Sequence, residues 1–192
     1  MKTNVACLLL LLFLTQCDYT SKPASNKTGS PNSNSQAPPD NQKGQTIRWE
    51  TQGITFTVPS DWRKDESISD DEKKTDEKLL ALLWRGPRDQ SIEFTVDTPG
   101  DDFPAPIEVM LERDYESSKS NPYSADLHYQ EAGGVKGLYY STHQDDDRIK
   151  EYWLTYRHHK GKAQMVGVSL KGPKADRELL MTIFKSLKLE HD

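Results

Sequence analysis

The fold is decided by the stretch at residues 53–62, which reads GITFTVPSDW. Within it Ile54, Phe56 and Val58 alternate with threonines, and a period of two predicts a strand with one buried face. Pro59 lacks a backbone N–H and is expected to end that strand. The stretch therefore predicts the first well-defined strand of a β-containing domain.

Outward from this stretch, the chain continues as strands, a helix, more strands and a final helix. The other predicted strands are residues 47–50, 79–84, 92–96, 135–143, 149–158 and 163–171. The first helix is predicted to open at Pro104-Ala105-Pro106 and to bury Ile107, Met110, Leu111 and Tyr115. The second is predicted to begin at Pro173 and to bury Leu179, Leu180, Ile183, Phe184 and Leu187. Because no βαβ rhythm occurs, the order favours an α+β fold with an antiparallel sheet flanked by helices.

Two local motifs resemble those of the PsbP-like family, which includes the PsbP extrinsic subunits of photosystem II and bacterial envelope lipoproteins such as DcrB. The first is the opening strand at residues 53–62, and the second is the closing run at residues 183–189, IFKSLKL. The resemblance spans residues 46–189 in pattern. It implies an α/β/α sandwich around a central antiparallel sheet. It implies accessory and binding roles and no conserved enzyme activity, since fold alone does not fix function.

The N-terminus has the features of a lipoprotein signal peptide. A charged start precedes an apolar run from Val5 to Leu14, which is too short for a membrane-spanning helix of about 20 residues. Residues 14–17, LTQC, resemble the bacterial lipobox, in which a leucine stands three residues before the lipidated cysteine. We therefore expect a signal peptide at residues 1–16 and lipidation of Cys17. Cleavage nearby without lipidation, giving a soluble secreted protein, is the alternative.

Residues 17–45 are rich in Ser, Asn and Pro and carry almost no apolar side chain, so they predict a disordered tether. The globular domain is then residues 46–192. The other cysteine, Cys7, lies in the signal peptide, so no internal disulfide is expected. The formal net charge of -5 argues against nucleic-acid binding, which needs a basic surface. The expected location is the periplasmic or extracellular face of a membrane.

Two weak candidate sites lie in the second half of the domain. His143, Asp145 and Asp147 stand at the turn between two predicted strands and offer metal-ligand side chains, although tight zinc binding needs about four convergent ligands. In the aromatic strands that flank this turn, alternation leaves Tyr140 and Trp153, or their neighbours, as an exposed partner-binding surface. Core packing is the alternative for each aromatic residue.

The sequence contains no phosphate loop, dinucleotide fingerprint, HExxH or GxSxG motif, so no catalytic residue and no cofactor are predicted. The leading interpretation is a membrane-tethered, non-enzymatic binding or accessory lipoprotein of the bacterial cell envelope. Its partners would be the membrane, through Cys17, and an envelope protein complex. The alternative is a metal-binding sensor or an enzyme that uses His143 and the turn at Asp145–Asp147.

Overall fold

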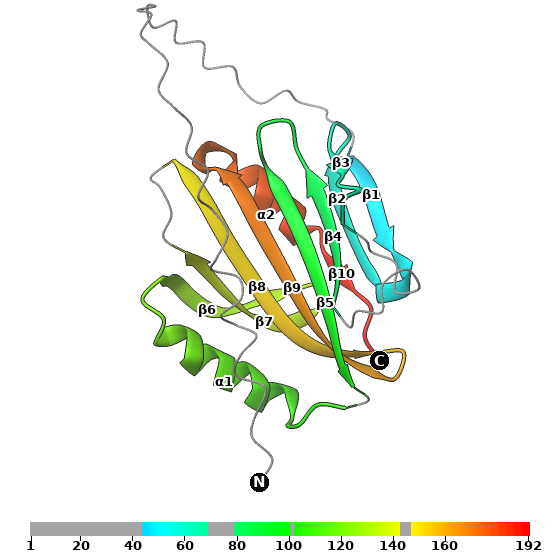
Figure 1. Cartoon of the computed structure of the whole chain (residues 1–192), viewed down its shortest axis with the longest axis vertical. Coiled ribbons are helices and arrows are strands. Elements are labelled where there is room, and N and C mark those ends of the chain that lie inside the picture. The colour runs from blue at the N-terminus through cyan, green and yellow to red at the C-terminus, as the bar shows by residue number, and fades with distance from the viewer. Residues whose placement is uncertain (1–43, 69–78, 101, 143–146) are drawn as a thin grey trace, which may run out of the picture. The chain divides into compact units, whose positions relative to one another are not determined.

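A seven-stranded antiparallel sheet forms the centre of the computed structural model, which describes residues 44–68, 79–100, 102–142 and 147–192 (Figure 1). Its spatial order is β3-β4-β5-β9-β8-β7-β6. The strands are β3 (Arg63–Lys64), β4 (Leu79–Arg85), β5 (Ser91–Gly100), β6 (Ser124–Ala132), β7 (Val135–Thr142), β8 (Arg148–His159) and β9 (Lys162–Pro173). The long β8–β9 hairpin lies near the middle of the sheet. Because β9 pairs with β5 and β8 pairs with β7, segments that are far apart in the sequence lie side by side.

A second, three-stranded sheet has the order β1-β2-β10. Its strands are β1 (Gly44–Trp49), β2 (Ile54–Pro59) and β10 (Lys188–Leu189). A short 3-10 turn, Glu50–Gln52, joins β1 to β2 and ends at Gly53, whose φ of 58° is a left-handed conformation that glycine adopts without strain. The strand predicted within residues 53–62 is therefore confirmed as β2; it pairs with β1, which contains most of the predicted strand 47–50, and β10 adds a strand on its other side.

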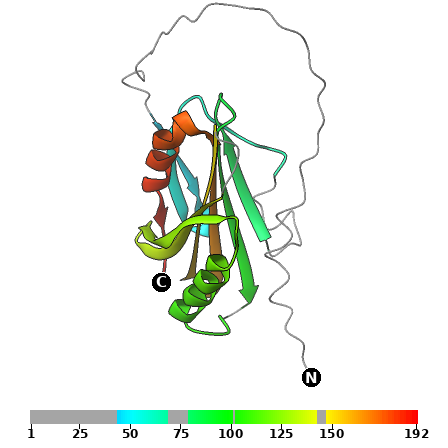
Figure 2. The same cartoon turned by 90° about the vertical axis from the view of Figure 1, so that its left-hand side faces the viewer.

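The main core lies between the large sheet and a layer made of the small sheet and helix α2 (Arg177–Lys185) (Figure 2). Phe56 of β2 packs on Phe94 of β5, with ring centroids 4.3 Å apart. The Phe184 ring of α2 and the Trp153 ring of β8 pack in an edge-to-face arrangement, with ring centroids 5.8 Å apart. Both helices are amphipathic, and burial of such apolar faces is the main source of stability in a domain of this size.

Helix α1 (Ile107–Lys119) packs on the opposite face of the large sheet. Its buried residues Met110 and Leu111 contact Leu138 of β7 and Tyr156 of β8. Because side chains alternate along a strand, Tyr156 faces α1 while Trp153 faces α2. The two helices therefore lie on opposite faces of the sheet, and the predicted α+β fold with an antiparallel sheet flanked by helices is confirmed.

One long strand was not predicted, and two details of the predicted elements were wrong. Residues 124–132, which lack clear alternation, form the edge strand β6. Pro173 ends β9 instead of beginning a helix, and a 3-10 turn at Lys174–Asp176 precedes α2. Leu187 lies beyond the end of α2, yet it is buried beside β10. Within the described residues, no helix is long and apolar enough to cross a membrane.

The C-terminal residues are held in place by a buried arginine. Arg157 is 1% exposed, and its guanidinium donates hydrogen bonds to the carbonyl oxygens of Gln52, Gly53 and Glu190. It also donates to the side-chain oxygen of Gln164 at 3.2 and 3.0 Å. Burial lowers the pKa of Arg157 to about 10, so it remains charged at neutral pH. One side chain thus joins the β1–β2 turn, β9 and the C-terminal segment.

His159, next to this arginine, is a buried titratable side chain. It is 4% exposed, and among the described residues its Nε2 has no hydrogen-bond partner. Burial, and then the charges of Arg157 and Lys160, hold the pKa of His159 below its ordinary value, although Glu190 opposes this. The unfolded chain therefore binds a proton more readily than the folded one, and stability contributed by the neutral ring is lost as pH falls.

We expect the free energy of unfolding to decrease as pH falls below about 6.5, by at most about 1.4 kcal/mol per pH unit from this residue. Urea unfolding at several pH values measures the effect. His159→Gln should flatten the decrease, whereas the matched variant His158→Gln, at a side chain 40% exposed, should retain it. An unchanged pH profile in His159→Gln would show that another group is responsible.

Candidate functional site

The predicted metal-binding residues are only partly within the described chain. Asp147 is exposed, and its carbonyl oxygen accepts a hydrogen bond from the Lys174 amide at 2.8 Å. His143 and Asp145 lie outside the described residues, as does Cys17. Elsewhere in the described segments, no three His, Cys, Asp or Glu side chains are grouped so as to hold a metal ion. The metal site and the lipidation site therefore stay predictions.

The prediction that Trp153 is exposed on a partner surface was wrong. Trp153 is 2% exposed, and its indole Nε1 donates a hydrogen bond to the Gln130 carbonyl oxygen at 2.9 Å. It pairs with Tyr139 across β7 and β8, and both side chains face α2. Alternation places Tyr140 on the other face, where it remains half-buried. Only Tyr140 of the two predicted residues is therefore on a surface that a partner can reach.

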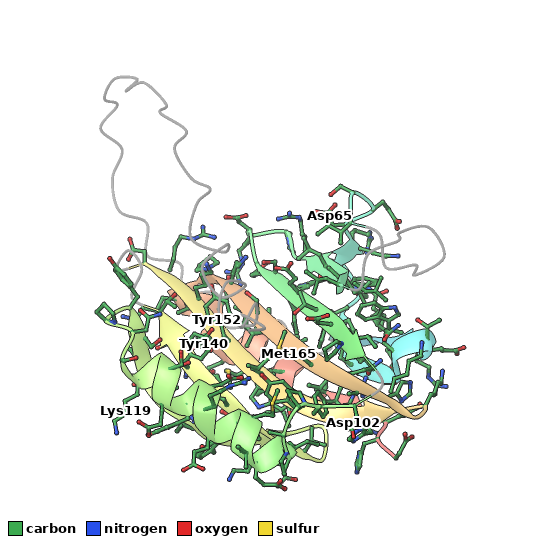
Figure 3. The ribbon with its side chains drawn as sticks, turned by 60° about the horizontal axis from the view of Figure 1, so that its bottom comes forward. Asp65, Asp102, Lys119, Tyr140, Tyr152 and Met165 are labelled. Atoms are coloured by element: carbon green, nitrogen blue, oxygen red, sulfur yellow. The ribbon has the colours of Figure 1, made fainter. Side chains whose placement is uncertain are left out.

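Tyr140 belongs to a half-buried surface of the large sheet beside α1 (Figure 3). Its ring stacks on Tyr152 of β8, with centroids 5.0 Å apart and planes inclined by 19°. Leu154 and Met165 lie on the same face by strand register, and both are half-buried. We call these four residues, Tyr140, Tyr152, Leu154 and Met165, the α1-side face. They present apolar area on a rigid, hydrogen-bonded support.

Charged groups on strands β5, β8 and β9 border the α1-side face. The Lys150 Nζ lies 5.2 Å from the Tyr152 ring centroid, and the Lys171 Nζ lies 3.7 Å from a Glu93 carboxylate oxygen. Burial, followed by charge interactions with neighbouring groups, raises the pKa of Tyr140 to about 12 and that of Tyr152 to about 12. Both phenols therefore stay neutral at physiological pH and can donate or accept hydrogen bonds.

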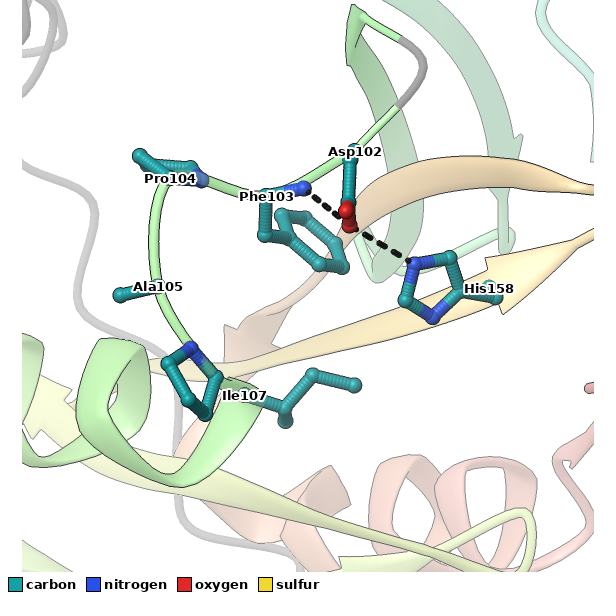
Figure 4. Close-up of a pocket in the computed structure, with 7 residues that line it drawn as sticks. Asp102, Phe103, Pro104, Ala105, Ile107 and His158 are labelled. Carbon is teal, nitrogen blue, oxygen red and sulfur yellow. Dashed lines mark hydrogen bonds and ion pairs between the residues drawn. The ribbon is translucent and has the colours of Figure 1, made fainter.

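At one end of α1, the same side of the molecule carries a shallow pocket of about 420 Å³ (Figure 4). It is lined by Asp102, Phe103, Pro104, Ala105, Pro106, Ile107 and His158. Asp102 Oδ1 accepts a hydrogen bond from the Phe103 amide at 2.8 Å and lies 3.4 Å from Nε2 of His158. The Phe103 ring packs edge-on against both His158 and Tyr156, with centroids 5.3 and 5.4 Å apart. The pocket thus has apolar walls and one polar end.

Comparison with known proteins finds similarity in the chain trace. Cyanobacterial PsbP (CyanoP) from Synechocystis sp. PCC 6803 matches with a TM-score of 0.49 and 13% identity, over 84% of this chain and 98% of that one. LpqN, involved in cell envelope biogenesis of Mycobacterium tuberculosis, matches with a TM-score of 0.48 and 15% identity, over 77% and 90%. The Ran-binding protein Mog1p of Saccharomyces cerevisiae matches with a TM-score of 0.42 and 10% identity, over 78% and 96%.

No protein-family model matches the sequence, and no curated protein is similar to it at a significant level. All three TM-scores are below 0.5, and fold does not determine function. The functional proposal therefore rests on the residues of this chain.

Sequence reasoning missed the pocket at the end of α1. Its lining combines one short loop with His158, which stands more than fifty residues later and is brought close because β5 and β8 both pair with β9 at Ala163. The available signal was the run Phe103-Pro104-Ala105-Pro106, an apolar and conformationally restricted loop just before a helix. Nothing in the sequence pointed to His158 as its neighbour.

Proposed function

We propose that the protein is a membrane-tethered, non-enzymatic binding or accessory lipoprotein of the bacterial cell envelope. Lipid at Cys17 would attach the chain to a membrane, and the predicted tether would serve as a flexible spacer up to residue 43, because Gly44 and Gln45 belong to β1. The globular domain would bind an envelope protein on the periplasmic or extracellular side. The observation that carries the binding role is the α1-side face, where Tyr140, Tyr152 and their neighbours are half-buried on a rigid sheet.

Several properties of this face suit protein recognition. Tyrosine is enriched at protein interfaces because it combines a large apolar area with a hydroxyl group and few rotatable bonds. The stacked pair of Tyr140 and Tyr152 is already ordered, so little side-chain entropy would be lost on binding. Lys171 and Glu93 at its border offer polar contacts of both signs. An apolar, aromatic centre with a polar border is typical of a protein–protein interface.

Photo-crosslinking in cells tests this role. A photoreactive phenylalanine analogue placed at Tyr140 or at Tyr152 should give crosslinks to one envelope protein. The matched control is the analogue at Lys185, an exposed residue of α2 on the opposite layer, which should not give that product. Equal crosslinking from Lys185, or none from the two tyrosine positions, would contradict binding through the α1-side face.

The alternative, a metal-binding sensor or enzyme at His143 and Asp145–Asp147, makes a different prediction. It requires heat of binding when Ca²⁺, Mn²⁺ or Zn²⁺ at micromolar concentration is added to the purified protein, and loss of that heat in a His143→Ala variant. The proposed binding role requires neither. Of the described residues, Asp147 contributes an exposed position and one backbone hydrogen bond, which do not by themselves favour a metal.

A further inference from the structure

The start of α1 exposes a second apolar surface that adjoins the pocket. Pro104 and Pro106 are exposed, and Val109 is 52% exposed although it is apolar. Pro104 and Pro106 also line the pocket, and Val109 follows them in the first turn of α1. We call this surface, made of Pro104, Pro106, Val109 and the pocket, the α1 entry patch. An exposed apolar surface beside a pocket is a common mark of an interaction site.

The α1 entry patch is built on an ordered loop. Pro104 and Pro106 restrict the backbone, and Pro106, at the cap of α1, has φ of -53° and ψ of 148°. Phe103 fixes the loop to the sheet through its edge contacts with Tyr156 and His158. Tyr156 in turn donates a hydrogen bond to Asp114 of α1. Because the loop is held on both sides, binding to it would cost little ordering entropy.

The segment that carries this patch is rich in carboxylates. Residues 102–116 contain five acidic side chains, Asp102, Glu108, Glu112, Asp114 and Glu116, and one basic side chain, Arg113. Asp114 is engaged by Tyr156 and lies 3.6 Å from Arg113, whereas Asp102, Glu108 and Glu112 are exposed. The patch therefore combines apolar walls with a negative border, and its complement is a surface that alternates apolar and basic groups.

We infer that the α1 entry patch is the docking site for a peptide segment with alternating apolar and basic side chains, contributed by a partner protein. This inference rests on the proposed function and names the chemistry of the partner. An apolar side chain would enter the pocket beside Phe103 and Ile107. Flanking lysines or arginines would pair with Asp102 and Glu108. An anionic lipid surface is the poorer occupant, because the carboxylates would be repelled by its headgroups.

Peptide binding to the full chain, purified in detergent, tests the inference. The probe is a fluorescent peptide that repeats Leu-Lys-Gly, compared with peptides that repeat Leu-Glu-Gly and Ser-Lys-Gly. Fluorescence polarisation should show at least about tenfold weaker binding for both comparison peptides, equivalent to about 1.4 kcal/mol each. Val109→Ser and Asp102→Asn should each weaken binding of the Leu-Lys-Gly peptide by about three- to tenfold.

The controls remove side chains of the same general character, one apolar and one carboxylate, that are also exposed. Tyr123→Ser removes another exposed apolar side chain, at 60% exposure, and Glu66→Gln removes another exposed carboxylate. Both variants should bind the probe like the wild type. Circular dichroism should show that all four variants remain folded, since each changes an exposed side chain.

Three results would overturn the inference: equal binding of the Leu-Lys-Gly and Leu-Glu-Gly peptides, wild-type affinity in Val109→Ser and Asp102→Asn, or a Cys17→Ala protein that binds anionic vesicles through Val109. The proposed function is tested separately. If crosslinks form at Tyr152 while the peptide does not bind, the α1 entry patch is not the docking site and the binding role stands. If the peptide binds while Tyr140 and Tyr152 give no crosslinks, the patch is retained and the α1-side face is rejected.

Discussion

Replacing Arg157 with methionine is expected to lower the free energy of unfolding by about 3–5 kcal/mol. Methionine fills part of the space but leaves the carbonyl oxygens of Gln52, Gly53 and Glu190 without this donor. A buried polar group that loses its partner costs about 1–3 kcal/mol, and several are affected here. Urea unfolding followed by tryptophan fluorescence measures the change.

Two further variants separate the role of the guanidinium from that of its charge. Arg157→Lys keeps the charge but cannot donate in the same planar geometry, so it should recover only part of the stability. Arg148→Met removes an arginine that is 41% exposed and paired with Asp89, and it should cost at most about 1 kcal/mol. An Arg157→Met protein as stable as the wild type would show that these hydrogen bonds do not hold the C-terminal segment.

Trp153→Ala is expected to destabilise the domain by about 3–5 kcal/mol, the range for loss of a large buried aromatic side chain. The ring covers Gly137, where any side chain would collide with it, and it also packs on Phe184. Its removal leaves a cavity between β8 and α2 and takes away the hydrogen bond that the indole donates to the Gln130 carbonyl oxygen. The midpoint of urea unfolding should fall while Tyr123→Ala, at 60% exposure, changes stability by no more than about 0.5 kcal/mol.

The same variant decides whether Trp153 has a direct role in binding. If it is only a core residue, loss of partner crosslinking at Tyr152 should follow loss of folded protein. A Trp153→Ala protein with wild-type stability and abolished crosslinking would restore the interpretation of Trp153 as a contact residue. That outcome would contradict the burial on which the correction is based.

Strands and helices with strong periodicity could be predicted from the sequence. Ile54, Phe56 and Val58 are buried on one face, as their alternation indicates, and α1 buries Met110 and Leu111. Strand β6 could not be predicted, because an edge strand contacts the core on one side only and its residues 124–132 lack an apolar alternation. A local sequence pattern thus predicts strands and helices that bury one face, and it misses elements that are only partly buried.

The candidate site was less predictable, because the face of the sheet on which a side chain lies depends on strand register. A shift of one residue reverses the face of every side chain in a strand, and register was fixed here by the long β8–β9 pairing. Tyr139 and Tyr140 looked equivalent in the sequence, yet one is buried beneath α2 and the other faces α1. The burial of Arg157 could not be predicted, because the carbonyl groups that accept its hydrogen bonds lie in distant segments.

The most direct test of the membrane-tethered account is the intact mass and membrane fractionation of the protein produced in its native host, beside a Cys17→Ala variant. The account predicts acyl mass on the wild-type protein at Cys17, recovery of that protein with membranes, and release of the variant into the soluble fraction. A wild-type protein without acyl mass that fractionates with the soluble proteins, as the variant does, would contradict it and indicate a secreted binding module.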